Sequence, residues 1–240
     1  MPKRSQQVEA EALKTDSRQI LIVDGAPLTE EVLQHRRVAV ATVDGRSYYN
    51  IIKALKLMDI QFDSISPAEA AESNARVIIT TRNEAGMVNK RVMTFLDTEL
   101  EKYPAISKAR ILRTIAGPDA DDQLIIGIDP GSRIGISVIY LNQEISSIVE
   151  SSVHDAVEQV SALLGGITSK NRIVRIGDGG IRMTAEIAKM LKARFRDSVR
   201  IEIVNEHGTS RNADANRRGA RDRSSARTIA FRTGRSFSLR

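Results

Sequence analysis

Three consecutive apolar segments of strand length, followed by alternating helical and strand patterns, constrain the fold of the second half of the chain most. The strand-like segments lie at 123–128, 135–141 and 144–151. After them come, in order, a helical pattern at 155–164, a strand at 172–176, a helix at 183–195, a strand at 200–204 and a helix at about 222–232. The predicted order is β-β-β-α-β-α-β-α, whereas a simple dinucleotide-binding unit alternates throughout.

The first half of the chain predicts a small doubly wound α/β domain over about residues 18–115. A helical pattern begins at Ser66, where Pro67 fits the first helical position. The polar stretch 117–122 contains Gly and Pro and is the predicted linker. We therefore expect residues 1–117 to form a domain of unknown role with a polar N-terminal arm, and residues 123–240 to form a second domain. The predicted elements of the first domain are strands at 19–23, 37–43, 62–65, 76–81 and 92–96 and helical segments at 29–33 and 48–58.

Two Asp-Gly pairs, at 24–25 and 44–45, follow strand patterns of the first domain, where ligands bind in such folds. Neither pair is followed by a glycine-rich dinucleotide fingerprint or a phosphate-binding loop. Turn formation accounts for both pairs. We therefore do not expect catalysis in this domain.

The positive charge of the chain is concentrated at its C-terminal end. Residues 205–240 contain nine arginines, no lysine and three acidic residues, which accounts for the whole net charge of +6. Guanidinium groups form bidentate contacts with phosphates, so this segment predicts a surface that binds a polyanion. A solubilising basic tail is the alternative interpretation. Because aromatic residues make up only 4% of the chain, stacking on single-stranded bases is not expected.

The composition also bears on compartment and chemistry. The chain has no Cys, which excludes disulfides, cysteine zinc sites and thiol catalysis. No apolar run approaches the ~20 residues needed to span a bilayer. The polar N-terminal residues lack the apolar core of a signal peptide. We expect a cytoplasmic protein with no membrane partner.

Four acidic residues fall where the predicted elements would bring them together. Asp129 ends the first strand of the second domain, and Asp178 and Glu206 end the fourth and fifth. In a sheet of this kind these three strands are parallel neighbours, so their carboxyl ends meet at one edge. Asp222 opens the last helix and shares a face with small and apolar residues four, seven and eight positions later, which would face the sheet.

Clustered carboxylates repel one another unless a cation neutralises them. Mg²⁺ and Mn²⁺ prefer oxygen ligands, and two such ions about 4 Å apart can activate a water and stabilise the departing oxygen in phosphodiester cleavage. We therefore predict that the four acids are the catalytic residues and the ligands of Mg²⁺ or Mn²⁺, with His207 as a candidate proton donor or phosphate contact. Turn formation at Asp129 and helix capping by Asp222 are the alternatives.

The motif Ile-Gly-Ile-Asp-Pro-Gly-Ser-Arg-Ile-Gly at 126–135 resembles the opening motif of the RuvC-type Holliday junction resolvases and their YqgF relatives. In that group the aspartate, here Asp129, binds metal, and the later glycine allows the hairpin to the second strand. The stretch around Glu206 is similar to the end of the fifth strand of YqgF-like proteins, and Asp222 to the acid on the last helix. Asp178 stands near the fourth-strand acid, which is Glu in RuvC proteins, and the usual Arg after Glu206 is absent.

The resemblance covers roughly residues 123–233 and implies an RNase H-like domain. It implies a metal-dependent endonuclease that hydrolyses phosphodiesters in structured DNA or RNA, with a role in DNA recombination and repair. By analogy alone, it also implies a homodimer. Contacts to nucleic-acid phosphates are expected from Arg133, Arg211, Arg217, Arg218, Arg221 and Arg223.

Two rival functions remain at this point. One is a nucleic-acid-binding protein of the same superfamily whose catalytic site is degenerate. The other is an ATP-binding protein like acetate kinase or Hsp70, which would need a second phosphate loop and a duplicated domain. At 240 residues the chain is too short for both.

Overall fold

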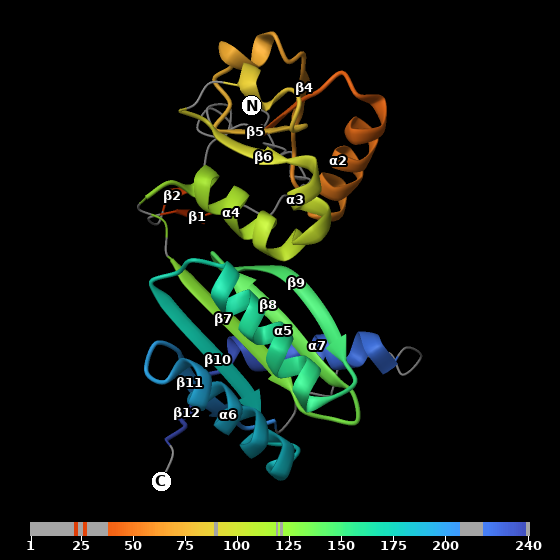
Figure 1. Ribbon diagram of the computed structural model, residues 1–240. Coiled ribbons are helices and arrows are strands. Elements are labelled where there is room, and N and C mark those ends of the chain that lie inside the picture. Colours follow the sequence, from red (N-terminus) through yellow and green to blue (C-terminus); the bar gives the residue numbers. More distant parts are fainter. Residues whose placement is uncertain are drawn as a thin grey trace, which may run out of the picture.

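The computed structural model describes residues 22–23, 26–27, 38–88, 91–118, 120, 122–206 and 218–238. The chain is an α/β protein with a four-stranded parallel sheet followed by a six-stranded mixed sheet (Figure 1). A short antiparallel ribbon, β1 (Ile22–Val23) with β2 (Ala26–Pro27), is described ahead of them. The helix expected at 29–33, most of the strand expected at 19–23 and the N-terminal arm lie outside the described residues.

The four-stranded sheet has the order β4-β3-β5-β6, and all of its strands are parallel. Its strands are β3 (Val38–Ala41), β4 (Asp63–Ile65), β5 (Val77–Thr80) and β6 (Met93–Leu96). Alternate residues such as Val40 and Ile79 face the helices α2 (Gly45–Leu57), α3 (Asp97–Lys102) and α4 (Pro104–Ala116). Every second residue of the strands faces the helices, and each helix turns an apolar stripe toward the sheet. Together these residues form the core.

A doubly wound unit has α-helices on both faces of its sheet, and the other face of this sheet departs from that expectation. Among the described residues, 3-10 turns and not α-helices lie over it: η1 (Glu69–Ala71) and η2 (Ala85–Met87). The helix predicted from Ser66 is a single turn, in which the Glu69 carboxylate accepts hydrogen bonds from the Ser66 backbone N and Oγ at 2.7 and 2.8 Å. The apolar residues there, Ala70 and Ala75, are too small and too few to form a helical stripe.

The six-stranded sheet has the order β12-β11-β10-β7-β8-β9. In it, β7 pairs antiparallel with β8 and parallel with β10, and β10 pairs parallel with β11. From β7 to α7 the element order along the chain is the one predicted from the sequence, and a short strand that was not predicted, β12, follows it. Its strands are β7 (Gln123–Asp129), β8 (Ile134–Tyr140), β9 (Gln143–Glu150), β10 (Asn171–Gly177), β11 (Arg200–Val204) and β12 (Arg235–Ser236).

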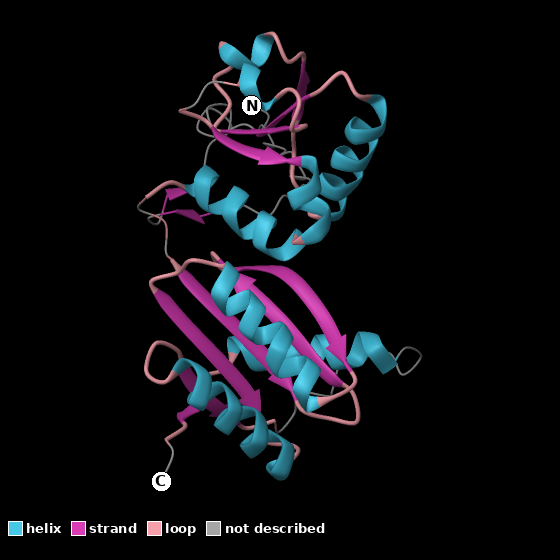
Figure 2. Cartoon of the chain, in the orientation of Figure 1, coloured by secondary structure: helices cyan, strands magenta, loops and turns pink. Residues whose placement is uncertain are grey.

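Helices lie on both faces of this second sheet (Figure 2). On one face α5 (Val153–Gly166) and α6 (Ile181–Phe195) cover Leu124, Ile126 and Ile128 of the central strand. On the other face α7 (Arg218–Phe231) covers the alternate residues, among them Ile125 and Gly127. Because side chains alternate between the two faces of a strand, Asp129 lies on the same face as Ile125 and Gly127, the face that α7 covers.

The helix α4 belongs to both cores and lies between the two sheets (Figure 1). Its Ile111 and Ile115 contribute to the core of the first sheet, whereas Ile106 and Ala109 contribute to that of the second. Ile106 lies so close to Gly166 that a Cβ there would collide with the isoleucine. Because one helix carries apolar residues for two cores, it docks the domains against each other.

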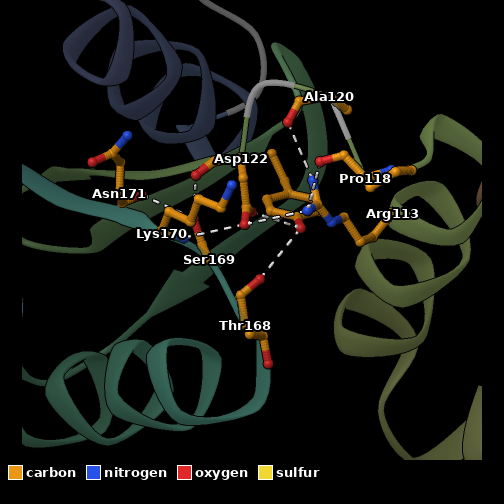
Figure 3. A network of polar contacts seen from close by, with 9 residues as sticks. Arg113, Pro118, Ala120, Asp122, Thr168, Ser169, Lys170 and Asn171 are labelled. Atoms are coloured by element: carbon orange, nitrogen blue, oxygen red, sulfur yellow. Dashed lines mark hydrogen bonds and ion pairs between the residues drawn. The ribbon is translucent and has the colours of Figure 1, made fainter.

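The linker is held by a polar network around Asp122, as Figure 3 shows. Arg113 of α4 donates to the carbonyls of Ala120 and Pro118, at 3.2 and 3.4 Å, and lies 3.7 Å from a carboxylate oxygen of Asp122. The Tyr140 hydroxyl donates to Asp122 Oδ1 at 3.2 Å. The predicted linker is thus anchored to α4 on one side and to β8 on the other.

The helices of the described residues are short. The longest, α6, has 15 residues. None of the described helices is both long enough and apolar enough to cross a membrane.

Candidate active site

The carboxyl ends of β7, β10 and β11 form one edge of the second sheet, because these strands are adjacent and parallel. Asp129 is the last residue of β7, Asp178 directly follows β10, and Glu206 follows β11. Asp122, which contacts α4, precedes the other end of β7, and seven residues of extended strand span ~23 Å. The acidic edge therefore lies at the end of the sheet away from α4 (Figure 1).

Asp178 and Glu206 are in direct contact. The Glu206 backbone N donates to Asp178 Oδ1 at 3.0 Å, and the Asp178 backbone N donates to the Val204 carbonyl at 3.0 Å. The Glu206 carboxylate lies over two glycines, because a Cβ at Gly177 or Gly179 would collide with its oxygens. The Gly-Asp-Gly-Gly sequence at 177–180 thus makes room for this carboxylate.

The electrostatics of this pair favour a cation. Burial raises the pKa of Glu206, and the negative charge of Asp178 raises it further, while a hydrogen bond from the Gly179 backbone lowers it. Two carboxylates held this close in a partly buried place are stabilised when positive charge is added.

Asp129 and Asp222 approach each other through β8 and α7. Asp129 is paired with Gly135 across the β7–β8 hairpin. The Asp222 carbonyl lies against Gly135, where a Cβ would collide with it. The residues predicted to face the sheet from α7, Ala226, Ile229 and Ala230, are all fully buried, which confirms the predicted face of this helix.

The four acids therefore surround one edge but do not form a closed cluster. Their carboxylate oxygens are the donor type that Mg²⁺ and Mn²⁺ prefer, and the close approach of Gly177 and Gly179 fixes where the Glu206 carboxylate lies. Within the part of the chain that the structure describes, no three His, Cys, Asp or Glu side chains converge closely enough to hold a metal ion. His207 and the residues up to 217 lie outside that part.

The predicted phosphate-binding arginines are distributed over several places. Arg133 is exposed in the turn between β7 and β8, beside the acidic edge, and Arg223 is exposed on α7. Arg218 and Arg221 lie in the first turn of α7. Arg211 and Arg217 lie outside the described residues.

A buried ion pair beside this edge escaped the sequence analysis. Arg175 of β10 and Glu202 of β11 meet at 2.8 Å on the α7 face, and Arg175 Nη1 also donates to the Ala230 carbonyl at 2.6 Å. The available signal was the presence of charged residues inside otherwise apolar strands. Such residues occupy strand interiors only when they are paired.

The corresponding edge of the first sheet carries helix caps and loop contacts. Asp44 Oδ1 accepts a hydrogen bond from Ser47 N at 2.7 Å and caps α2. Glu84 joins two loops, since its carboxylate accepts from Val43 N at 2.8 Å and from Thr81 Oγ1 at 2.6 Å. Capping explains the Asp-Gly pair at 44–45, whereas the pair at 24–25 lies outside the described residues.

Comparison with known families gives one match. Residues 37–109 match the family model of a response regulator receiver-like domain, REC-like_halo. The match runs from the start of β3 into α4 and covers less than a third of the chain. The sheet order β4-β3-β5-β6 corresponds to the first four strands of a flavodoxin-like sheet, which agrees with this match. No curated protein matches the chain.

The resemblance to RuvC-type resolvases and their YqgF relatives was therefore a wrong identification. The family model that matches is receiver-like and is not a nuclease family, and no matching relative carries either name. The motif at 126–135 has a local explanation: β7 is a central, buried strand, and the turn after Asp129 leads into β8. Gly135 is required because the α7 backbone lies against it.

Proposed function

We propose that residues 123–240 form an RNase H-like domain that hydrolyses phosphodiesters in nucleic acid with Mg²⁺ or Mn²⁺. One observation carries this proposal: counting strands from β7, the sheet order is 6-5-4-1-2-3, with Asp129, Asp178 and Glu206 at the shared carboxyl edge of strands 1, 4 and 5. Ligands of open α/β sheets bind outside the carboxyl ends of the strands. The acids thus stand where a substrate would bind.

The roles follow from position. Asp129, Asp178, Glu206 and Asp222 would hold the cations, which would supply an activated water and neutralise the charge on the departing oxygen. The Asp178 carboxylate fixes the start of the Glu206 segment through its hydrogen bond to the Glu206 backbone. Arg133 stands exposed beside the edge and would contact a phosphate of structured DNA. The excess of arginine toward the C-terminus would add further phosphate contacts.

The test is a cleavage assay of the full chain on four-way junction, flap and duplex DNA and on RNA, with Mg²⁺, with Mn²⁺ and with a chelator. We expect cation-dependent cleavage that Asp129→Asn lowers by at least about 100-fold, since it removes a charged ligand from the reacting centre. Asp197→Asn is the matched control, because Asp197 is an acid with a 98% exposed side chain that contacts Lys192 on α6. If the wild-type chain cleaves none of these substrates, the proposal is wrong.

A second candidate is a nucleic-acid-binding protein of the same fold without catalysis. The observation that favours it is that the described acids do not close into a group of three. In that case the chain binds DNA in a salt-dependent way, none of the substrates is cut, and Asp129→Asn leaves the affinity unchanged.

A further inference from the structure

A cavity of about 380 Å³ lies between α4 and the second domain, far from the acidic edge. From α4 it is lined by Ile106, Arg110, Arg113 and Thr114, and from the second domain by Tyr140 and Ile167. Small-molecule sites have volumes of roughly 300–1,000 Å³ and occur preferentially at domain interfaces. The cavity meets both criteria.

Most of the cavity wall is apolar. Ile106 and Ile167 face it from opposite domains, and Met93 and Ala109 extend the apolar surface. Ile167 is buried and Ile106 half-buried, so the wall is built from residues that the core already holds in place. An apolar ligand body would replace water there without reorganising the protein.

Arg110 provides a positive charge in a fixed position. Its guanidinium carbon lies 4.6 Å from the centre of the Phe95 ring, and Nη2 lies 3.9 Å from the sulfur of Met93. Its ion pair with Glu99 is long, at 3.7 Å, so this carboxylate does not make a short contact with it. A stacked guanidinium loses little entropy when an anion binds, which favours affinity.

Arg113, one turn further along α4, has a different task. It holds the linker through Ala120, Pro118 and Asp122, the network that Figure 3 shows beside Thr168. Its charge is therefore partly balanced by Asp122. Glu99 lies at the same distance of 3.7 Å from Arg110, but the Arg110 side chain is 42% exposed against 29% for Arg113, so Arg110 is the more accessible cation of the cavity.

We propose that this cavity binds a small organic anion, with its apolar body against Met93 and Ile106 and its acidic group on Arg110. A ligand in this place contacts α4 and the second domain together, so it would stabilise the docking of the receiver-like domain. The proposal is independent of the proposed nuclease activity.

The probe is 8-anilinonaphthalene-1-sulfonate, which has an apolar body and one negative charge. Fluorescence titration of the full chain should show saturable binding of one molecule per chain. Arg110→Gln should weaken this binding about tenfold, because it removes one charge-assisted contact. The same substitution should leave unchanged the binding of N-phenyl-1-naphthylamine, which has the same skeleton without the sulfonate.

Arg194→Gln is the matched control. The Arg194 side chain is 43% exposed and paired with Glu158, as the Arg110 side chain is 42% exposed and paired with Glu99. Arg194→Gln should bind both probes like the wild type. If Arg110→Gln and Arg194→Gln give the same affinity for the sulfonate, the role assigned to Arg110 is wrong.

Two further measurements locate the ligand. Thr114→Phe places a ring in the cavity and should abolish binding of both probes; if it unfolds the chain, the Arg110 comparison still decides. Displacement of the sulfonate by benzoate assigns a carboxylate as the natural group, and displacement by phenyl phosphate assigns a phosphate. Displacement by neither compound overturns the proposal.

Discussion

Arg175 and Glu202 form a nearly buried ion pair across the neighbouring strands β10 and β11, with 2.8 Å between Nε and Oε2. The same guanidinium donates to the Ala230 carbonyl in the last turn of α7. Arg175 therefore ties together three elements: the strands that lead to Asp178 and Glu206, and the helix that carries Asp222. The geometry of the acidic edge depends on this arginine, although it does not reach the edge itself.

Breaking this pair from one side is expected to be costly. Arg175→Met leaves the nearly buried Glu202 with the longer, 3.7 Å contact to Arg200, so we expect a cost of about 3 kcal/mol in the free energy of unfolding, the lower end of the range for a broken buried pair. The double variant Arg175→Met with Glu202→Leu should recover most of this loss, because it buries no charge. Urea denaturation of both variants measures the difference. If the double variant is as unstable as the single one, the cost comes from lost packing and not from an unpaired charge.

A second prediction concerns the contact between α7 and the sheet. Gly135→Ala places a methyl group against the Asp222 carbonyl, so we expect it to push α7 outward and destabilise the chain by about 1–3 kcal/mol. Gly165→Ala is the control, since Gly165 lies in the last turn of α5 and a Cβ there meets nothing within 4 Å. This control should raise stability by up to about 1 kcal/mol. Equal effects of the two substitutions would contradict the close approach of α7.

The fold could be predicted from the sequence wherever periodicity was strong. The strand ending at Asp129 follows from a continuous apolar run, the strand ending at Val204 from alternation, and the buried face of α7 from the spacing of small and apolar residues. The helix expected at Ser66 failed because a Ser-Pro start and a glutamate three residues later are also satisfied by one 3-10 turn.

The candidate site was less accessible to sequence reasoning. The carboxyl ends of strands predict which acids share an edge, but not how closely their oxygens approach. The contact of the Glu206 carboxylate with Gly177 and Gly179 depends on the register of β10 against β11, and one sequence does not give a register. The 126–135 motif suggested the wrong family for a related reason. A buried strand followed by a turn requires those residue types in many families.

A third prediction follows from Tyr140, whose side chain is buried beside Asp122. Burial, followed by the charge of Asp122, raises the pKa of Tyr140 from 10.0 to about 12. The unfolded chain releases this phenolic proton near pH 10 while the folded chain keeps it, so stability is lost as pH rises from 10 toward 12. The loss is on the order of 2 kcal/mol.

Denaturation of wild type and Tyr140→Phe across this range measures the effect. The variant should lack this part of the alkaline loss, whereas Tyr49→Phe, at a residue that is 61% exposed, should behave like the wild type. Identical alkaline curves for Tyr140→Phe and the wild type would show that the phenol is not held neutral by its surroundings.

The last prediction links the acidic edge to its cation. Because burial and Asp178 both disfavour the charge on Glu206, Glu206→Gln should be more stable than the wild type when a chelator is present. A cation bound only by the folded chain reverses this order, since at 100 times its Kd it adds about 2.7 kcal/mol. Glu206→Gln, which lacks a ligand charge, should gain much less from Mg²⁺ or Mn²⁺.

Thermal unfolding with and without cation decides between the outcomes, and Glu158→Gln provides the matched control. Glu158 is an exposed glutamate paired with Arg194 on the other face of the sheet, so its variant should respond to cation like the wild type. If Glu206→Gln gains as much from Mg²⁺ and Mn²⁺ as the wild type does, the cation binds elsewhere, and the contact between Asp178 and Glu206 serves only to join β10 to the end of β11.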